Sequence, residues 1–240
     1  MAFLKTSCIA ALTLSLLSAC GDDQQTPSTN QQLPSTTRQI LIDFNQPAIG
    51  WQSGDSDYSE GTAPTKRDAQ QKPLPSPWVG NGFYTLNANR SDDLFVYLKK
   101  QIDGFIPNKT YRLNFKVSFI TNTPQGCVGV GGSPDAVTIK AGASTIEPIT
   151  VYQGTEYVMN IDKGNQVPGG LNAISLGNIG NSRQDCSQWQ YEEKLLASNQ
   201  VIDVKADAQG TLWLFVGMDS GFESSSHVYY RTINVSAVPL

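Results

Sequence analysis

The chain has 240 residues, a formal net charge of −4, 16% charged residues and one histidine. A mildly acidic chain lacks the basic patch or stripe that binds a phosphate backbone, which excludes nucleic acid as a partner. A single histidine excludes transition-metal sites with several imidazole ligands. The 21 glycines and 13 prolines favour strands and turns over long helices.

The N-terminus has the features of an export signal. Lys5 precedes an apolar run over residues 8–17 that is too short to span a bilayer, and small residues follow it. The tetrad Leu17-Ser18-Ala19-Cys20 resembles the lipobox of bacterial lipoproteins. This resemblance implies a signal peptide over residues 1–19, cleavage before Cys20, and lipid on Cys20 that anchors the protein to a membrane. The alternative is an ordinary secretory signal with a chance cysteine.

Residues 20–38 are expected to form a lipidated, disordered tether, because Gln, Thr, Ser and Pro dominate and there is almost nothing to bury. No later apolar stretch approaches the length of a membrane span. We therefore expect a cell-envelope protein whose membrane partner is reached through lipid alone. Gly21 after the cysteine implies the outer membrane if the organism is Gram-negative.

Two cysteines, Cys127 and Cys186, remain once Cys8 is removed with the signal peptide and Cys20 carries lipid. An exported protein enters an oxidising compartment, so these two are predicted to form a disulfide. A redox or metal role would need a further cysteine or several histidines nearby.

The folded domain is expected over residues 39–240. Its clearest strand covers residues 110–121, where five apolar residues alternate with polar ones. Residues 212–216 are apolar on both faces, which predicts a central strand. Further strands are expected over residues 83–87, 94–98, 136–140, 157–161, 201–204, 211–217 and 228–235. Residues 188–198 can form a short helix. The pattern predicts an all-β fold, an antiparallel β-sandwich of the jelly-roll type in one domain.

Residues 41–44 (Leu-Ile-Asp-Phe), Gly50-Trp51, residues 110–115 and residues 228–235 resemble the jelly-roll framework of galactose-binding-like domains and carbohydrate-binding modules. That resemblance implies that the first and last strands pair, and it suggests a glycan as ligand by analogy of fold alone. Four other segments resemble landmarks of an uncharacterised family of bacterial envelope proteins: residues 92–95, 129–134, 160–166 and 215–223.

Three aromatic residues are candidate ligand contacts. Trp51, Tyr58 and Trp78 flank or lie in a polar tract over residues 53–77, which is expected to be a long loop. Long loops are usually functional or disordered, and an aromatic ring offers a flat apolar face to a sugar. The alternative is that these rings cap the ends of the sandwich. Trp189 is a further candidate, and Trp213 is expected in the core.

Asp219 and Glu223 are candidate ligand-binding carboxylates in the loop that is expected to leave the central strand. Two carboxyl groups about 5–10 Å apart are also what a glycosidase needs. Asp219-Ser220-Gly221 is equally a turn sequence. No serine elbow exists and His227 stands alone, so a catalytic triad is not expected.

The segment over residues 162–166 offers oxygen ligands for calcium, although a glycine turn is the default reading, and no cofactor or metal is predicted. The sequence therefore favours a non-enzymatic, lipid-anchored envelope protein that binds a ligand, with a glycan as the candidate ligand. Two rivals stay open. One is a carboxylate-dependent glycoside hydrolase or lyase, and the other is a structural or adhesion protein without a small ligand.

Overall fold

The computed structural model describes residues 36–88, 90 and 93–240. The predicted signal peptide, the predicted lipid-attachment residue Cys20 and the predicted tether as far as residue 35 lie outside the described residues. Within the described ranges no helix is long and apolar enough to cross a bilayer.

Strands make up almost all of the regular structure in this part of the chain, joined by one 3-10 turn, η1 (Glu60–Thr62). In chain order the strands are β1 (Arg38–Asp43), β2 (Gln52–Ser56), β3 (Tyr58–Ser59), β4 (Lys66–Pro73), β5 (Asn81–Ala88), β6 (Leu94–Ile102), β7 (Thr110–Thr121), β8 (Val137–Ser144), β9 (Thr150–Gln153), β10 (Glu156–Met159), β11 (Ala173–Asn178), β12 (Glu192–Ala197), β13 (Ile202–Lys205), β14 (Leu212–Ser220) and β15 (Ser225–Pro239).

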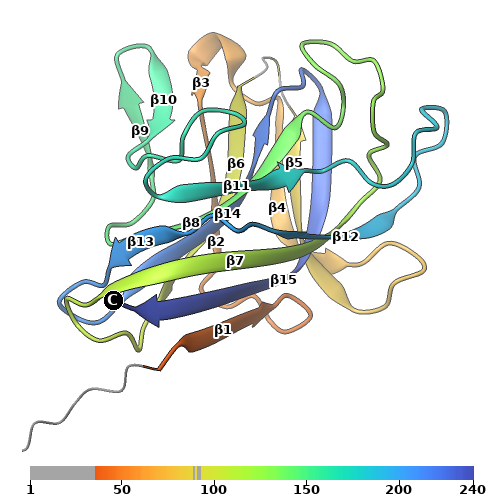
Figure 1. The fold of residues 1–240 in the computed structure, drawn as a ribbon. Coiled ribbons are helices and arrows are strands. Elements are labelled where there is room, and N and C mark those ends of the chain that lie inside the picture. The colour runs from red at the N-terminus through yellow and green to blue at the C-terminus, as the bar shows by residue number, and fades with distance from the viewer. Residues whose placement is uncertain (1–35, 89, 91–92) are drawn as a thin grey trace, which may run out of the picture. The chain divides into compact units, whose positions relative to one another are not determined.

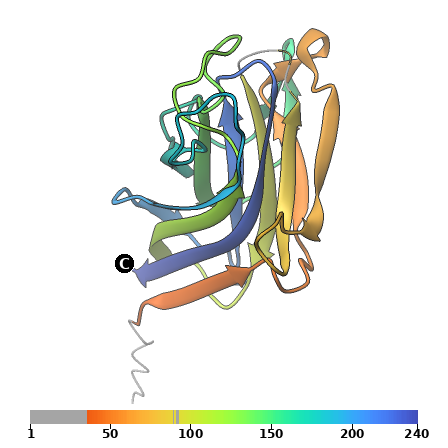
Figure 2. The same ribbon diagram turned by 90° about the vertical axis from the view of Figure 1, so that its right-hand side faces the viewer.

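Two stacked sheets form the sandwich, as predicted (Figures 1 and 2). The larger sheet has seven strands in the order β12-β7-β15-β5-β4, with β1 added on β15 and β13 on β7. The smaller sheet has five strands in the order β11-β8-β14-β6-β2, and β3, β10 and β9 form a separate three-stranded sheet. Neighbouring strands pair antiparallel, and β1 pairs with the last strand, β15, as the jelly-roll resemblance implied.

The core lies between the two large sheets and explains the alternation seen in the sequence. Along β7, Leu113, Phe115 and Val117 are buried in it, while Arg112 and Lys116 are exposed, which confirms the predicted strand. Each fully buried apolar side chain contributes about 1.5–3 kcal/mol. β14 lies third of the five strands in its sheet, so the prediction of a central strand is confirmed.

The outer face of the five-stranded sheet is covered as well. Phe95, Tyr97 and Phe215 point to that face and pack against Met159 of β10 and the partly buried Ile161. Lys163, in the connection between β10 and β11, is buried and contacts the buried Asp219 of β14.

Two expected segments differ from the structure. Residues 188–198 form no helix, because β12 pairs with β7 there and its side chains alternate between half-buried and exposed. The tract over residues 53–77 is no long loop, since it forms β2, β3, η1 and β4. Both are edge segments rich in polar residues, so their composition does not mark them as strands. Their backbone hydrogen bonds come from neighbouring strands: β2 pairs with β6, β4 with β5, and β12 with β7.

The predicted disulfide is confirmed. Cys127 and Cys186 are bonded, with their Cα atoms 5.7 Å apart. The bond joins the loop after β7 to the loop before β12, and thereby ties together two long connections at the rim of the sandwich.

Candidate functional site

The predicted aromatic residues do not share one site. Trp51 immediately precedes β2 and Tyr58 lies in β3 just after it, so β2 separates them. Trp78 lies in the connection between β4 and β5. This connection lies near the loop between β1 and β2, which contains Trp51, because the backbone N–H of Asn81 donates to Asn45 Oδ1 at 3.0 Å. The binding lip expected from Trp51, Tyr58 and Trp78 together is therefore not formed.

Trp51 has the contacts of a core-capping residue. Its ring meets Phe44 edge-on with centroids 5.1 Å apart, and its side chain packs against the main core. Phe44 in turn contacts Phe83. Trp78 is half-buried, and Trp189 is exposed, with its indole N–H donating to the carbonyl of Cys186.

Asp219 and Glu223 are also separated by their surroundings. Asp219 lies inside β14 and not in the expected loop, opposite Phe95 on one side and Thr138 on the other. It is 0% exposed, whereas Glu223 lies exposed in the connection to β15. A substrate cannot reach a fully buried carboxylate, so the arrangement does not provide the paired acid and base of a glycosidase.

Tyr58 belongs to a row of three tyrosines, which we call the tyrosine row. Tyr157 of β10 lies directly opposite both Tyr58 of β3 and Tyr152 of β9. Its ring stacks on Tyr58 with centroids 4.8 Å apart, and it meets Tyr152 at 5.0 Å. Directly opposite residues project from the same face of a sheet, so the three rings line one face. Tyr152 is 58% exposed and ends the row in solvent.

A charged pair adjoins the other end of the tyrosine row. The guanidinium of Arg67 lies over the Tyr58 ring, 5.7 Å from its centroid, and forms an ion pair with Asp55. Burial and the Asp55 charge raise the pKa of Tyr58, and Arg67 opposes them. Asp55 and Arg67 also line a small pocket of about 140 Å³ between β2 and β4. Aromatic faces beside hydrogen-bonding charges are the usual components of a small-ligand site.

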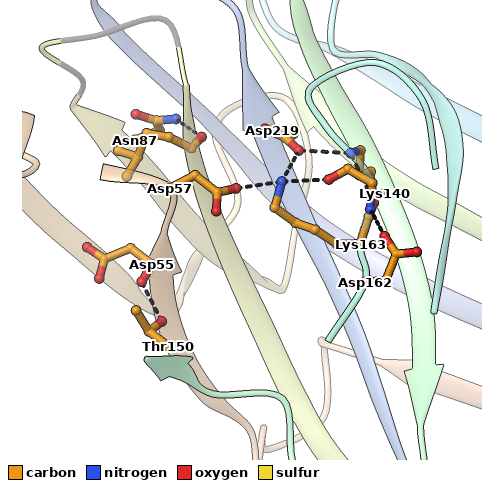
Figure 3. A network of polar contacts seen from close by, with 10 residues as sticks. Asp55, Asp57, Asn87, Lys140, Thr150, Asp162, Lys163 and Asp219 are labelled. Carbon is orange, nitrogen blue, oxygen red and sulfur yellow. Dashed lines mark hydrogen bonds and ion pairs between the residues drawn. The ribbon is translucent and has the colours of Figure 1, made fainter. Parts of the chain in front are cut away.

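A buried network of charges lies beneath this end of the sandwich (Figure 3). Lys140 of β8 and Asp219 are both 0% exposed, and Lys140 Nζ lies 2.9 Å from Asp219 Oδ2. Lys163 Nζ lies 2.7 Å from the same oxygen and 2.5 Å from Asp57 Oδ2. Burial raises the pKa of Asp57, against the lowering effect of Lys163. Sequence reasoning missed this network, because its members come from four separate segments.

Asp57, Asp93 and Asp219 each offer a carboxylate oxygen within 4.8 Å of the others, which would suit a hard cation. The ammonium of Lys163 contacts two of these carboxylates, however, and supplies a positive charge from within the chain. The carboxylate of Asp162, considered above for calcium, accepts the backbone N–H groups of Gly164 and Leu171 at 2.9 and 3.0 Å. These bonds lower its pKa and make it a turn-stabilising residue.

A second aromatic cluster on the seven-stranded sheet was also missed. Tyr84 and Tyr229 lie opposite each other with ring centroids 4.9 Å apart, and Tyr191 Oη lies 3.0 Å from His227 Nε2. Burial raises the pKa of Tyr84 to about 12. The alternation of His227 and Tyr229 with buried Val228 and Tyr230 was the available sequence signal.

No known sequence family matches the chain, and no curated protein does. Among solved structures, the family 11 carbohydrate-binding module of a Clostridium thermocellum cellulosomal cellulase is similar at 10% identity and a TM-score of 0.38, over 85% of this chain and 95% of that one. A cleaved adhesin domain of Lys-gingipain from Porphyromonas gingivalis is similar at 10% identity and 0.34, over 82% and 97%. The mannan-recognising module TmCBM27 is similar at 9% and 0.34, over 83% and 98%. TM-scores below 0.5 do not indicate a shared ligand, so the site is interpreted from its own geometry.

Proposed function

We propose that this protein is a lipid-anchored protein of the cell envelope whose β-sandwich binds a glycan and does not transform it. The observation that carries the glycan proposal is the tyrosine row, which ends in the exposed ring of Tyr152 beside Tyr157. Tyrosine combines a broad apolar face with a polar edge, and a sugar ring presents C–H groups on its faces and hydroxyls around its rim.

The charged pair beside the row supplies directional contacts. The guanidinium of Arg67 donates in a fixed planar fork, and the carboxylate of Asp55 accepts. The pocket of about 140 Å³ that they line is smaller than a typical ligand pocket of about 300–1,000 Å³. It therefore suits a single unit or substituent of a longer ligand, whose neighbouring unit would lie on the tyrosine row.

The burial of Asp219 argues against the glycoside hydrolase alternative. Its carboxylate is held by two lysines inside the protein, whereas Glu223 lies exposed, so the two do not form an acid and base pair at one accessible site. A binding function needs no acid and base pair, whereas hydrolysis does.

The binding proposal is tested with the full protein, which includes residues 36–240, and a panel of soluble polysaccharides. Wild-type protein should bind at least one polysaccharide without cleaving it, and Arg67→Gln should weaken that binding while the unfolding temperature stays near the wild-type value. Absence of binding to every member of the panel would favour a structural or adhesion role.

The anchor is proposed from the sequence alone, because residues 1–19 and Cys20 lie outside the described structure. Metabolic labelling with a radioactive fatty acid should mark the wild-type protein and not the Cys20→Ser variant. Cys8→Ser is the matched control, since residue 8 falls within the removed segment and its loss should leave labelling unchanged. Labelling that persists in Cys20→Ser would refute the lipid anchor.

A further inference from the structure

The buried network contains an amine and a carboxyl group placed for condensation. Lys140 lies on β8 opposite Gly217 of β14, and Asp219 lies two residues further along β14. Both side chains project to the outer face of the five-stranded sheet, because Ile139 and Ala141 on either side of Lys140 point into the main core. Diagonal neighbours on adjacent strands lie within reach of long side chains.

Water is excluded from this pair. Both residues are 0% exposed, and the apolar cluster of Phe95, Phe215 and Met159 covers the same face of the sheet. Asp219 Oδ1 accepts no hydrogen bond from any residue that the structure describes. A buried carboxylate oxygen without a donor has lost its hydrogen bonds to water without replacement, which costs free energy in the folded state.

The two lysines are not equivalent. Lys163 Nζ has three acceptors, which are Asp57 Oδ2, Asp219 Oδ2 and the carbonyl of Gly164, as a charged ammonium requires. Burial works to lower its pKa, but Asp219 and Asp57 outweigh burial and raise it. Lys140 has two acceptors among the described residues, Asp219 Oδ2 and the carbonyl of Lys163 at 3.1 Å, and burial lowers its pKa. Lys140 is therefore the amine that becomes neutral and nucleophilic.

We propose that Lys140 Nζ and Asp219 Cγ condense to an amide that covalently links β8 to β14. Proton transfer within the ion pair gives a free amine and a carboxylic acid. The amine attacks Cγ, a C–N bond forms, and the Cγ–Oδ2 bond breaks. Two of the three protons of the original ammonium leave with Oδ2 as one water molecule, and the third remains on the amide nitrogen. No oxidant or co-reactant is needed.

Lys163 and Asp57 are assigned the proton transfers. Lys163 already donates to Oδ2, the atom that leaves, so it can protonate that oxygen as the Cγ–Oδ2 bond breaks. It regains a proton from the attacking nitrogen, and Asp57 holds it in place through their 2.5 Å ion pair. Asp57 itself adopts a left-handed backbone conformation at φ 65°, which a non-glycine residue rarely does without a functional or structural reason.

Peptide mapping of the purified, unfolded and reduced wild-type protein tests the proposal. Trypsin does not cleave after an acylated lysine, so a branched peptide should join residues 117–163 to residues 206–231, lighter than the sum of its two parts by one water molecule. Quantitative recovery of linear peptides ending at Lys140 would overturn the proposal. A branch at Lys163 in place of Lys140 would overturn the assignment of the nucleophile.

Lys99 and Glu147 provide an internal control. Their N–O distance of 2.7 Å is as short as the lysine–carboxylate distances in the buried network, but the side chain of Glu147 is 44% exposed. This pair should therefore remain unlinked, and trypsin cleavage after Lys99 should be complete. Lys140→Arg keeps the charge and should abolish the branched peptide. Asp57→Asn should leave a substantial linear fraction in freshly made protein, and a full yield of branched peptide in that variant would refute the proton-transfer role.

Discussion

The ring of Tyr58 stacks on the ring of Tyr157, with centroids 4.8 Å apart and planes 17° apart. This contact fixes the short strand β3 against the β9–β10 hairpin and leaves the third ring, Tyr152, at the open end of the row. Two rings therefore serve the fold and one faces solvent, so the binding and stability effects of these tyrosines should separate.

Tyr152→Ala should weaken polysaccharide binding and barely change stability. A stacking aromatic ring contributes about 0.5–1.5 kcal/mol beyond its buried area, which corresponds to a loss of about 2- to 13-fold in affinity. Substitution of a largely exposed residue changes the unfolding free energy by about 0.5 kcal/mol or less. Titration calorimetry and urea unfolding measure the two quantities. Trp189→Ala, at another exposed ring, is the control and should leave affinity unchanged, whereas equal losses in both variants would count against the tyrosine row.

Trp51→Ala should destabilise the fold. The ring packs on Phe44 and the main core, and removing such a ring costs about 3 kcal/mol or more when the site cannot collapse. Urea unfolding should show a clear fall in the midpoint without loss of polysaccharide affinity at low temperature. Unchanged stability together with lost binding would instead restore Trp51 as a ligand contact.

Removal of the disulfide should lower stability. It closes a loop with a sequence separation of 59 residues, and the chain-entropy treatment gives about 4 kcal/mol for a loop of this size. The double variant Cys127→Ala with Cys186→Ala should therefore unfold at a markedly lower temperature than wild type. Adding reductant should shift the wild-type transition toward that of the variant, and an identical transition with and without reductant would contradict the expectation.

Acidification should destabilise the fold through His227. Burial, aided by the charge of Lys72, lowers the pKa of His227 from its ordinary value of 6.5. Below 6.5 the unfolded chain then binds a proton that the folded chain resists, so stability is full above that pH and is lost as the pH falls toward the lowered folded value.

Melting temperatures between pH 7.5 and 5 for wild type and His227→Gln measure this effect, with the window set around the ordinary histidine value of about 6.5. The wild-type protein should lose more stability than the variant over this interval. Parallel curves would show that other groups carry the acid sensitivity. Tyr191→Phe, which removes the hydroxyl next to His227 Nε2, should change the size of the effect without reversing it.

The sequence by itself determined the strands in which the pattern of apolar and polar residues matches the pattern of burial. The alternation along residues 110–121 and the doubly apolar run over residues 212–216 both hold in the structure, because each depends on local periodicity or composition. The pairing of the first and last strands also holds, and it was implied by the resemblance to jelly-roll domains. The disulfide followed from counting the cysteines that remain if the chain is exported and cleaved as the sequence predicts.

Only the tertiary structure decided which residues meet. Edge strands such as β2, β4 and β12 carry polar side chains and take their hydrogen bonds from partners elsewhere in the chain, so no local signal marks them. The sequence Asp219-Ser220-Gly221 is typical of a turn, yet Asp219 lies inside β14, where ion pairs with Lys140 and Lys163 stabilise its carboxylate. Tyr58 lies beside the tyrosines of β9 and β10, and not beside Trp51 or Trp78 as the sequence suggested. Strand pairing in an antiparallel sandwich brings together segments that are remote in the sequence. The pattern of residues within one segment does not show which other strand it pairs with.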